Sequence, residues 1–156
     1  MTKVFIGIDP GLDGAMAKHD GQHAHYYIMP TIKVGGKREI DLIAVLHWFE
    51  SLDADCFVAI EKVHSMPKQG VASSFTFGKG YGSLIGILVA RAIPYIEVAP
   101  QTWKKAMMPD MQKNKEAAIY RIQQMHPEIA LPKNKKHAVA VAEAYLMARY
   151  AQKMEG

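Results

Sequence analysis

The chain has 156 residues, of which 49% are hydrophobic, and this length and composition predict a single globular domain over residues 1–156. Its apolar runs are well short of the roughly 18 to 20 residues that span a bilayer, and its N-terminus lacks a basic segment followed by an apolar one, so we expect a cytoplasmic protein that does not bind a membrane. The single cysteine, Cys56, excludes an internal disulfide and a cysteine zinc cluster, and the net charge of +4 is a modest excess of basic residues.

The first half of the chain predicts four strands and one helix. Residues 41–52 predict the helix, because Asp41 is a suitable N-cap and apolar side chains then recur at helical spacing. The near-continuous apolar segment 56–61 predicts a buried strand. Three further strands joined by tight turns are predicted earlier in the chain, at 3–9, 14–20 and 24–30.

The second half of the chain predicts mainly helices. The glycine-rich segment 73–93 predicts a mobile loop that leads into a buried helix, because only its later apolar residues recur at helical spacing. A short strand is predicted at 93–98, and helices are predicted at 101–107, 113–125 and 138–154. This order of elements, with the last helix against the sheet, is typical of a ribonuclease H-like α/β fold, in which helices cover both faces of a mixed five-stranded sheet.

Two of the predicted strands end in a carboxylate. Asp9 ends the first strand where a glycine turn begins, and Glu61 ends strand 56–61. If the two strands are neighbours, both carboxylates meet at one place, where they repel each other unless a divalent cation such as Mg²⁺ or Mn²⁺ lies between them. The alternatives are a turn aspartate that stabilises its own loop, and a salt bridge from Glu61 to Lys62 or Lys3.

A third acid, Glu143, lies inside an apolar part of the last predicted helix. The side chains around it, such as Ala142, Ala144 and Leu146, leave little polar surface, so this carboxylate needs a partner. We therefore add Glu143 to the candidate site, with an exposed helical glutamate as the alternative.

Lysines concentrate in the last third of the chain, in the segments 104–105, 113–115 and 133–136. Such a positive face neutralises phosphates, and without a basic amphipathic helix that has an aromatic face it favours nucleic acid over a membrane. The glycine-rich segment adds aromatic side chains suited to stacking on unpaired bases. The alternatives are a solvated surface for the lysines and packing under the following helix for the two phenylalanines. The DNA-binding candidates are Lys68, Phe75, Phe77, Lys79, Tyr81, Lys105, Lys135 and Lys136.

Four segments of the chain, in order, resemble the RuvC-like Holliday junction resolvases, particularly the short versions carried by phages. The four segments are Gly7-Ile8-Asp9-Pro10-Gly11, Ala59-Ile60-Glu61-Lys62-Val63, Val98-Ala99-Pro100-Gln101-Thr102-Trp103-Lys104-Lys105 and Ala142-Glu143-Ala144-Tyr145-Leu146-Met147-Ala148. The first segment alone also resembles the start of sugar kinases, whereas the four together are specific. The likeness covers nearly the whole chain.

The resemblance implies a crossover junction endodeoxyribonuclease, which is a homodimer that binds a four-way DNA junction and cuts two strands by paired nicks. It also implies two Mg²⁺ or Mn²⁺ ions in each active site, held by Asp9, Glu61 and Glu143, and no nucleotide cofactor. Lys104 and Lys115 match positions where the family has functional lysines, which gives them a catalytic role in offsetting charge on the reacting phosphate. For Lys115 the alternative is a lysine on the helix surface.

The chain departs from the family pattern just before Glu143. The family usually has two acidic or histidine ligands on the last helix, about one turn apart, whereas Ala138, Val139 and Ala140 precede Glu143 by five, four and three residues. His137 is the nearby candidate metal ligand, although its six-residue offset suits the site only if the helix starts after it. Either His137 completes the site, or an alanine at one of these positions stands in place of a ligand.

The missing ligand leaves two functions open: a metal-dependent junction endonuclease, and a junction-binding protein whose catalysis has been lost or removed. A third class, a phosphotransferase of the sugar-kinase type, shares the acid-glycine strand turn. It is disfavoured because such enzymes need a second, duplicated domain, for which 156 residues leave no room.

Overall fold

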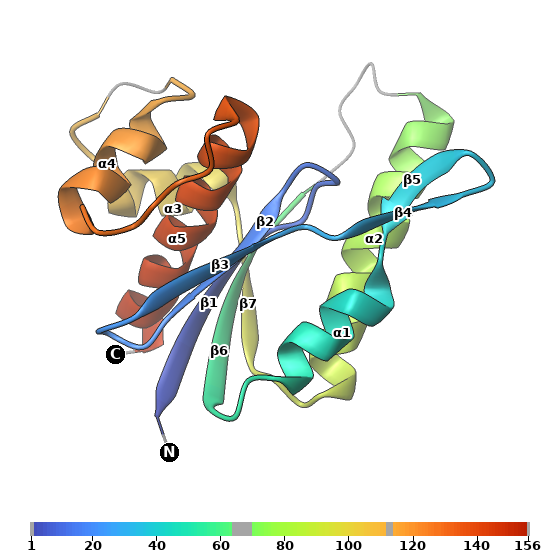
Figure 1. Ribbon diagram of the computed structural model, residues 1–156, viewed down its shortest axis with the longest axis horizontal. Coiled ribbons are helices and arrows are strands. Elements are labelled where there is room, and N and C mark those ends of the chain that lie inside the picture. Colours follow the sequence, from blue (N-terminus) through green and yellow to red (C-terminus); the bar gives the residue numbers. More distant parts are fainter. Residues whose placement is uncertain (1, 64–69, 112–113, 156) are drawn as a thin grey trace.

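The centre of the fold is a mixed five-stranded sheet (Figure 1). The computed structural model describes residues 2–63, 70–111 and 114–155. Strand β1 pairs antiparallel with β2 and parallel with β6, so the sheet joins an antiparallel half to a parallel half. The order across the sheet is β3 (Ala24–Ile28), β2 (Ala15–His19), β1 (Lys3–Asp9), β6 (Asp55–Glu61) and β7 (Tyr95–Val98).

Helices cover both faces of this sheet, as the sequence predicted. In Figure 1 the helices α3, α4 and α5 lie on one side of the sheet, and α1 and α2 lie on the other. None of the helices in the described part of the chain is long and apolar enough to cross a membrane. The helices are α1 (Leu42–Glu50), α2 (Val71–Ala90), α3 (Pro100–Met107), α4 (Ala117–Met125) and α5 (Lys135–Glu155).

Helix α5 packs very close to β1 because the strand carries a glycine at the contact. Alternate residues of β1 face opposite sides of the sheet, and Phe5 and Gly7 face α5. A Cβ atom placed on Gly7 would lie only 1.9 Å from the carbonyl oxygen of Ala144 and 2.6 Å from the backbone nitrogen of Ala148. The absent side chain therefore lets the helix backbone approach the strand directly.

The opposite face of the sheet carries a second apolar core. Val4, Ile6 and Ile8 of β1 pack there in one buried cluster with residues of α1 and α2, including Phe49 and Leu88. Helix α1 starts where the sequence predicted.

Asp41 is the N-cap of α1, because its Oδ1 atom accepts a hydrogen bond of 3.1 Å from the backbone nitrogen of Ala44.

Cys56 is a free, buried cysteine at the second position of β6, and burial raises the pKa of its thiol.

A hairpin that the sequence analysis did not predict precedes α1. Strands β4 (Thr31–Val34) and β5 (Lys37–Ile40) form a separate two-stranded sheet. Gly35 and Gly36 connect them with φ angles of +58° and +79°, the left-handed backbone that a two-residue turn of this kind requires. The Gly-Gly pair between two short alternating segments was the available signal.

The predicted mobile loop at the start of segment 73–93 is wrong. The chain is helical from Val71 to Ala90, glycines included, because the buried Leu84 and Leu88 fix this helix on the core. One of the glycines also serves a contact, since a Cβ atom on Gly80 would lie 3.2 Å from the Cδ1 atom of Ile40 in the hairpin. Tertiary packing here outweighs the low helix propensity of glycine.

Candidate functional site

Asp9 and Glu61 lie at the same edge of the sheet. They directly follow Ile8 and Ile60, which are paired in the parallel register of β1 and β6. Asp9 is two residues beyond Gly7 in an extended strand, and so it faces α5. Glu61 is two residues beyond Ala59, which belongs to the same core cluster as α5. Both carboxylates are therefore on the α5 side of the sheet.

Glu143 reaches this edge from α5. The residue that follows it, Ala144, has its carbonyl oxygen against Gly7, so the close contact between helix and strand places Glu143 beside the strand end. The side chain is half-buried, and its neighbours in the helix are buried.

The three acids and one lysine influence one another electrostatically. Burial raises the pKa of Asp9 to about 6, and the negative charge of Glu61 adds to the rise. Burial is also the main reason that the pKa of Glu143 is raised to about 7; Lys104 opposes the rise, and Asp9 and Glu61 contribute to it. The four side chains thus form one cluster in which negative charge is incompletely compensated.

A turn-stabilising role for Asp9 and a structural salt bridge for Glu61 do not explain why these acids lie close together. The backbone nitrogen of Gly11 donates to Asp9 Oδ1 over 3.4 Å, a long contact for a turn-stabilising hydrogen bond. Lys3 pairs with Asp55 and Glu155, so the predicted alternative of a salt bridge from Lys3 to Glu61 is wrong.

Glu61 is held instead by a tryptophan. Its Oε2 atom accepts a hydrogen bond of 2.7 Å from Nε1 of Trp103, a fully buried residue of α3. Trp103 has no signal in the sequence other than its place in the third matched segment. Asp13 was also missed, although it pairs with Arg38 at 3.1 Å and with Lys136 at 2.9 Å and so ties the loop after Asp9 to β5 and α5.

A basic cleft of about 750 Å³ opens beside Glu143. Lys104 and Lys105 contribute to it from α3, and Lys115 contributes from the segment before α4. Methionine and proline side chains line the apolar part of the cleft, and the amides of Gln101 and Asn114 lie at its border. The cleft thus combines cationic, amide and apolar groups next to a carboxylate of the cluster.

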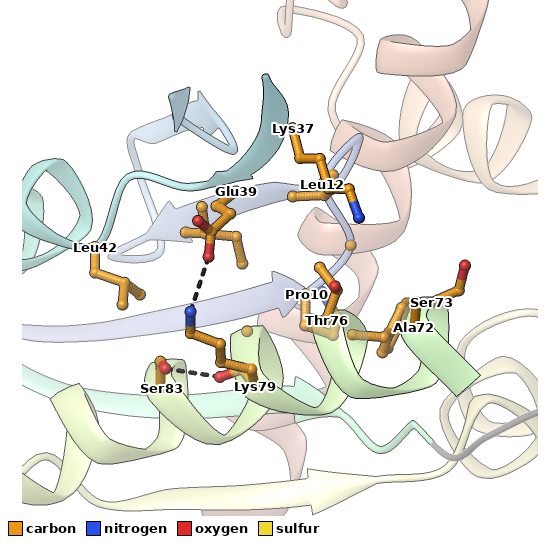
Figure 2. A pocket seen from close by; sticks show the side chains of 14 residues that line it. Pro10, Leu12, Lys37, Glu39, Leu42, Ala72, Ser73, Thr76, Lys79 and Ser83 are labelled. Carbon is orange, nitrogen blue, oxygen red and sulfur yellow. Dashed lines mark hydrogen bonds and ion pairs between the residues drawn. The ribbon is translucent and has the colours of Figure 1, made fainter. Parts of the chain in front are cut away.

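A smaller cavity of about 410 Å³ lies between α2 and the hairpin, beside the loop Pro10–Leu12 (Figure 2). The ion pair between Lys79 and Glu39, with Nζ and Oε1 3.0 Å apart, spans this cavity. Phe77 also lines it, but none of the three acids does. The cavity is therefore a neighbour of the acidic cluster and not part of it.

The structure places the predicted DNA-binding side chains in several environments. Phe75 and Phe77 are 72% and 38% exposed on α2, so packing under the following helix is the wrong alternative for them. The hydroxyl of Tyr81 donates to Glu97. Lys68 lies outside the described residues. DNA binding by these side chains stays a prediction.

The last predicted lysines lie near the start of α5. Lys135 pairs with Glu116, and Lys136 pairs with Asp13. Each has an acidic neighbour within the protein, so a phosphate would have to compete for these lysines. By contrast, Lys105 is exposed in the cleft.

His137 lies inside α5, which starts at Lys135. Six residues of helix rotate the chain by about 600°, so His137 points about 120° away from Glu143 around the helix axis. Ala138 and Ala140 are buried, at 6% and 4% exposure. Over the described ranges, no three His, Cys, Asp or Glu side chains are arranged so that they could hold one metal ion together. The acids form a cluster without a closed coordination shell, and the metal site stays a prediction.

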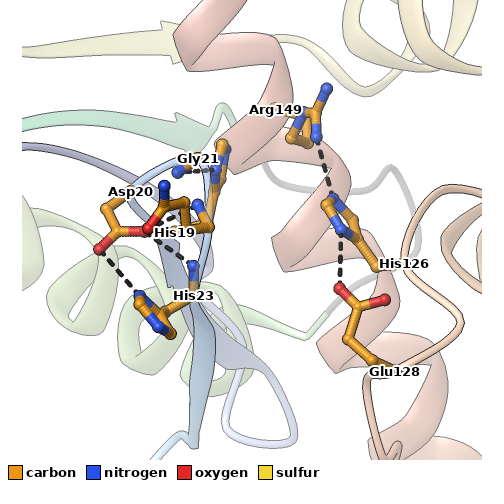
Figure 3. Close-up of polar contacts among 8 residues, drawn as sticks. His19, Asp20, Gly21, His23, His126, Glu128 and Arg149 are labelled. Atoms are coloured by element: carbon orange, nitrogen blue, oxygen red, sulfur yellow. Dashed lines mark hydrogen bonds and ion pairs between the residues drawn. The ribbon is translucent and has the colours of Figure 1, made fainter.

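A second polar cluster lies at the other end of β2 from the acids (Figure 3). His19 is 3% exposed; its Nδ1 atom accepts a hydrogen bond of 3.2 Å from the backbone nitrogen of Gly21, and its Nε2 atom has no hydrogen-bond partner among the described residues. Arg149 of α5 contacts His126 Nε2 at 2.9 Å, and His126 in turn contacts Glu128. Burial, together with the charges of Arg149 and His126, lowers the pKa of His19 to about 4.

Comparison with known proteins gives a fold relationship. No known family model and no curated protein sequence matches the chain. Among solved structures, Thermus thermophilus RuvC in complex with a Holliday junction substrate aligns with a TM-score of 0.64 at 17% sequence identity, over 97% of this chain and 96% of that one. A second structure of Thermus thermophilus RuvC aligns over the same shares with a TM-score of 0.54 at 18% identity. The chain therefore has the ribonuclease H-like fold of RuvC over nearly its whole length, which confirms the predicted fold class and, at the level of the fold, the resemblance found in the sequence.

Proposed function

We propose that this chain is a structure-selective DNA endonuclease that binds four-way junctions and resolves them by paired nicks. One observation carries the proposal: Asp9 and Glu61 end neighbouring parallel strands beside α5, and Glu143 of α5 lines a lysine-rich cleft at that place. The fold adds support, because it is shared with RuvC, for which a complex with a Holliday junction substrate has been solved.

The donor atoms of the cluster fit Mg²⁺ or Mn²⁺. They are hard carboxylate oxygens, the type of ligand that these ions prefer, and burial and mutual repulsion oppose the ionisation of Asp9 and Glu143 in the absence of a cation. Among the described residues these carboxylates are not arranged around one common point. We propose that Asp9, Glu61 and Glu143 turn toward one another to hold the metal, with two ions in each site. When bound, these ions would supply an activated water and charge stabilisation at the scissile phosphate.

The lysines of the cleft would bind and orient the DNA. Lys104 already interacts with the charges of Asp9 and Glu143, so it is placed to offset negative charge that develops on a phosphate at the cluster. Lys105 and Lys115 lie along the same cleft and suit contacts to neighbouring phosphates of the strand. Because a four-way junction offers two symmetric strands for cutting, we propose that two copies of the chain act together as a homodimer.

The decisive experiment compares a synthetic four-way junction with a linear duplex of the same sequence. We expect paired nicks in the junction with Mg²⁺ or Mn²⁺, no cutting of the duplex, and junction binding that weakens steeply with salt. The Asp9→Asn variant keeps the shape of the side chain and should bind the junction without cutting it. Equal binding to junction and duplex, or undiminished cutting by Asp9→Asn, would contradict the proposal.

One observation favours a second candidate, a junction-binding protein with weakened catalysis. Glu143 is the only acid of α5 before Glu155, and the residue one turn before it, Ala140, is buried. The same assay separates the two functions, because the second candidate binds the junction tightly and leaves both strands intact with either metal.

A further inference from the structure

Trp103 contacts Glu61 of the acidic cluster and the neighbouring Lys104 with different parts of one indole ring. The nitrogen at the ring edge donates to Glu61 Oε2 at 2.7 Å. The ring face lies under Lys104, whose Nζ atom is 5.5 Å from the ring centroid. Trp103 is fully buried in the core cluster that also includes Val98 at the end of β7.

The hydrogen bond to Glu61 is more than a way to satisfy a buried donor. An indole nitrogen only donates, and it does not titrate in the physiological range, so it holds a carboxylate in one orientation over a wide range of pH. With Oε2 engaged, Oε1 is the oxygen of Glu61 that this bond leaves available. In metal sites, such outer hydrogen bonds fix the orientation of the ligand and change the affinity for the ion.

The contact with Lys104 gives the same residue a second effect. Lys104 lines the same cleft as Glu143, so its ammonium group lies on the side of α3 where that carboxylate is found. The flexible lysine side chain has many rotamers, and an aromatic face beneath the ammonium restricts them.

We infer that Trp103 is a positioning residue of this site, which orients Glu61 through its indole N–H and Lys104 through its ring face. The inference rests on the proposed function for the role of the metal. A tryptophan that only filled the core would also need an acceptor for its buried N–H, but loss of that N–H would then leave metal affinity unchanged. The two roles are therefore separable by a variant that keeps an aromatic ring and removes the N–H.

The test compares Trp103→Phe with Trp48→Phe as a matched control. Trp48, the other tryptophan of the chain, packs on Tyr27 and Phe49 at the opposite face of the sheet. We expect Trp103→Phe to raise the Kd for Mn²⁺, measured from the electron paramagnetic resonance signal of free Mn²⁺, by about 10- to 100-fold, and Trp48→Phe to leave it unchanged. Equal Mn²⁺ affinity in the wild type and in a folded Trp103→Phe variant would overturn the inference.

A spectroscopic measurement tests the hydrogen bond without any metal. In the Trp48→Phe background, the single indole N–H resonance belongs to Trp103, and we expect it to shift when Glu61→Gln replaces the charged acceptor with a neutral one. An unchanged chemical shift of the Trp103 indole N–H in the Glu61→Gln variant would overturn the inference. If Trp103→Phe does not fold, benzothienylalanine at position 103 in the same background keeps the bicyclic shape, lacks the N–H and gives the same Mn²⁺ comparison.

The proposed function can fail independently of this inference. A chain whose Mn²⁺ affinity depends on Trp103, but which neither binds nor cuts a four-way junction, contradicts the proposed function and supports the positioning role.

Discussion

Asp9 and Glu61 each stand one residue beyond a paired isoleucine, at the carboxyl ends of two neighbouring parallel strands. The register brings two carboxylates to one edge of the sheet on the face that α5 covers. This proximity is unfavourable for the ionised acids, since burial and the charge of Glu61 raise the pKa of Asp9 to about 6. An arrangement that opposes ionisation without serving packing is typical of a functional site.

We predict that Asp9→Asn stabilises the fold at pH 8 in the absence of divalent metal. The pKa of Asp9 is about 6 in the folded protein and 3.8 ordinarily, so the folded state favours the protonated carboxyl group. This contribution to stability is fully present below pH 3.8 and is lost as the pH rises through about 6. The variant removes this loss, and we expect a gain of about 1 to 3 kcal/mol, or several degrees in Tm, at pH 8. Thermal unfolding at pH 8 and pH 4 measures it, and the gain should vanish at pH 4.

Asp20→Asn is the matched control, because its expected effect has the opposite sign. Backbone hydrogen bonds from His23 and Gln22 lower the pKa of Asp20 to about 2, so its ionised form stabilises the fold above pH 3.8 and that contribution is lost as the pH falls toward 2. Asp20→Asn should therefore lower Tm at pH 8. A lower Tm for Asp9→Asn at pH 8 would contradict the electrostatic description of the site.

The sequence indicated three candidate acids but not how the fold brings them together. Asp9 and Glu61 stood out because each is a carboxylate at the end of an apolar strand. Hydrophobic periodicity does not reveal strand order, so the adjacency of β1 and β6 could be expected only from the family resemblance. The contact between Trp103 and Glu61 joins residues 42 positions apart in the chain, and no local pattern encodes such a contact.

The glycines show the same limit of sequence reasoning. The Gly-rich start of α2 resembles a loop by propensity, and only the buried residues of its second half and the hairpin beside it explain why it is helical. Gly7 resembles any small residue in a strand, but it is where the backbone of α5 lies directly against β1. Tertiary contacts decide both cases.

We predict that Gly7→Ala strongly destabilises the protein. The added methyl group would lie 1.9 Å from the carbonyl oxygen of Ala144, and a helix backbone cannot yield as a flexible side chain can. Moving α5 away from β1 also moves Glu143 from Asp9, so we expect a loss of several kcal/mol in the free energy of unfolding and weaker metal binding. Urea unfolding followed by circular dichroism measures the loss.

Gly78→Ala is the control for a methyl group without a clash. Gly78 lies in α2, and a Cβ atom there would have no neighbour within 4 Å among the described residues. Because alanine has a higher helix propensity than glycine, the free energy of unfolding of this variant should rise by about 0.5 to 1 kcal/mol. If Gly7→Ala were as stable as the wild type, α5 would not depend on close contact with the strand.

We predict that His19 makes the protein sensitive to acid. Burial lowers the folded-state pKa of His19 from 6.5 to about 4, so the unfolded chain binds a proton more readily, and stability present above pH 6.5 is lost as the pH falls from 6.5 to 4. In His19→Asn the amide oxygen can still accept from Gly21, but the side chain does not titrate. Between pH 7 and pH 4 the wild type should lose about 3 kcal/mol more than this variant in urea unfolding. Equal losses would mean that the cluster in Figure 3 accepts a proton without penalty.

The last prediction concerns the missing ligand on α5. Ala140 precedes Glu143 by three residues, nearly one helical turn, so a carboxylate introduced at this position lies on the side of the helix that faces the cluster. Because Ala140 is 4% exposed, we expect Ala140→Asp to lower Tm without metal and to recover stability on addition of Mg²⁺ by more than the wild type does.

If position 140 stands in place of a lost ligand, Ala140→Asp should also raise Mg²⁺-dependent junction cutting by orders of magnitude, since an added oxygen ligand fixes the second ion. Ala138→Asp, five residues before Glu143, is the comparison for position, and His137→Ala tests the other candidate ligand. The direction of His137 around α5 leads us to expect little effect from its removal. Strong cutting by the wild type and by His137→Ala, with no gain from an aspartate at either alanine position, would mean that Asp9, Glu61 and Glu143 suffice.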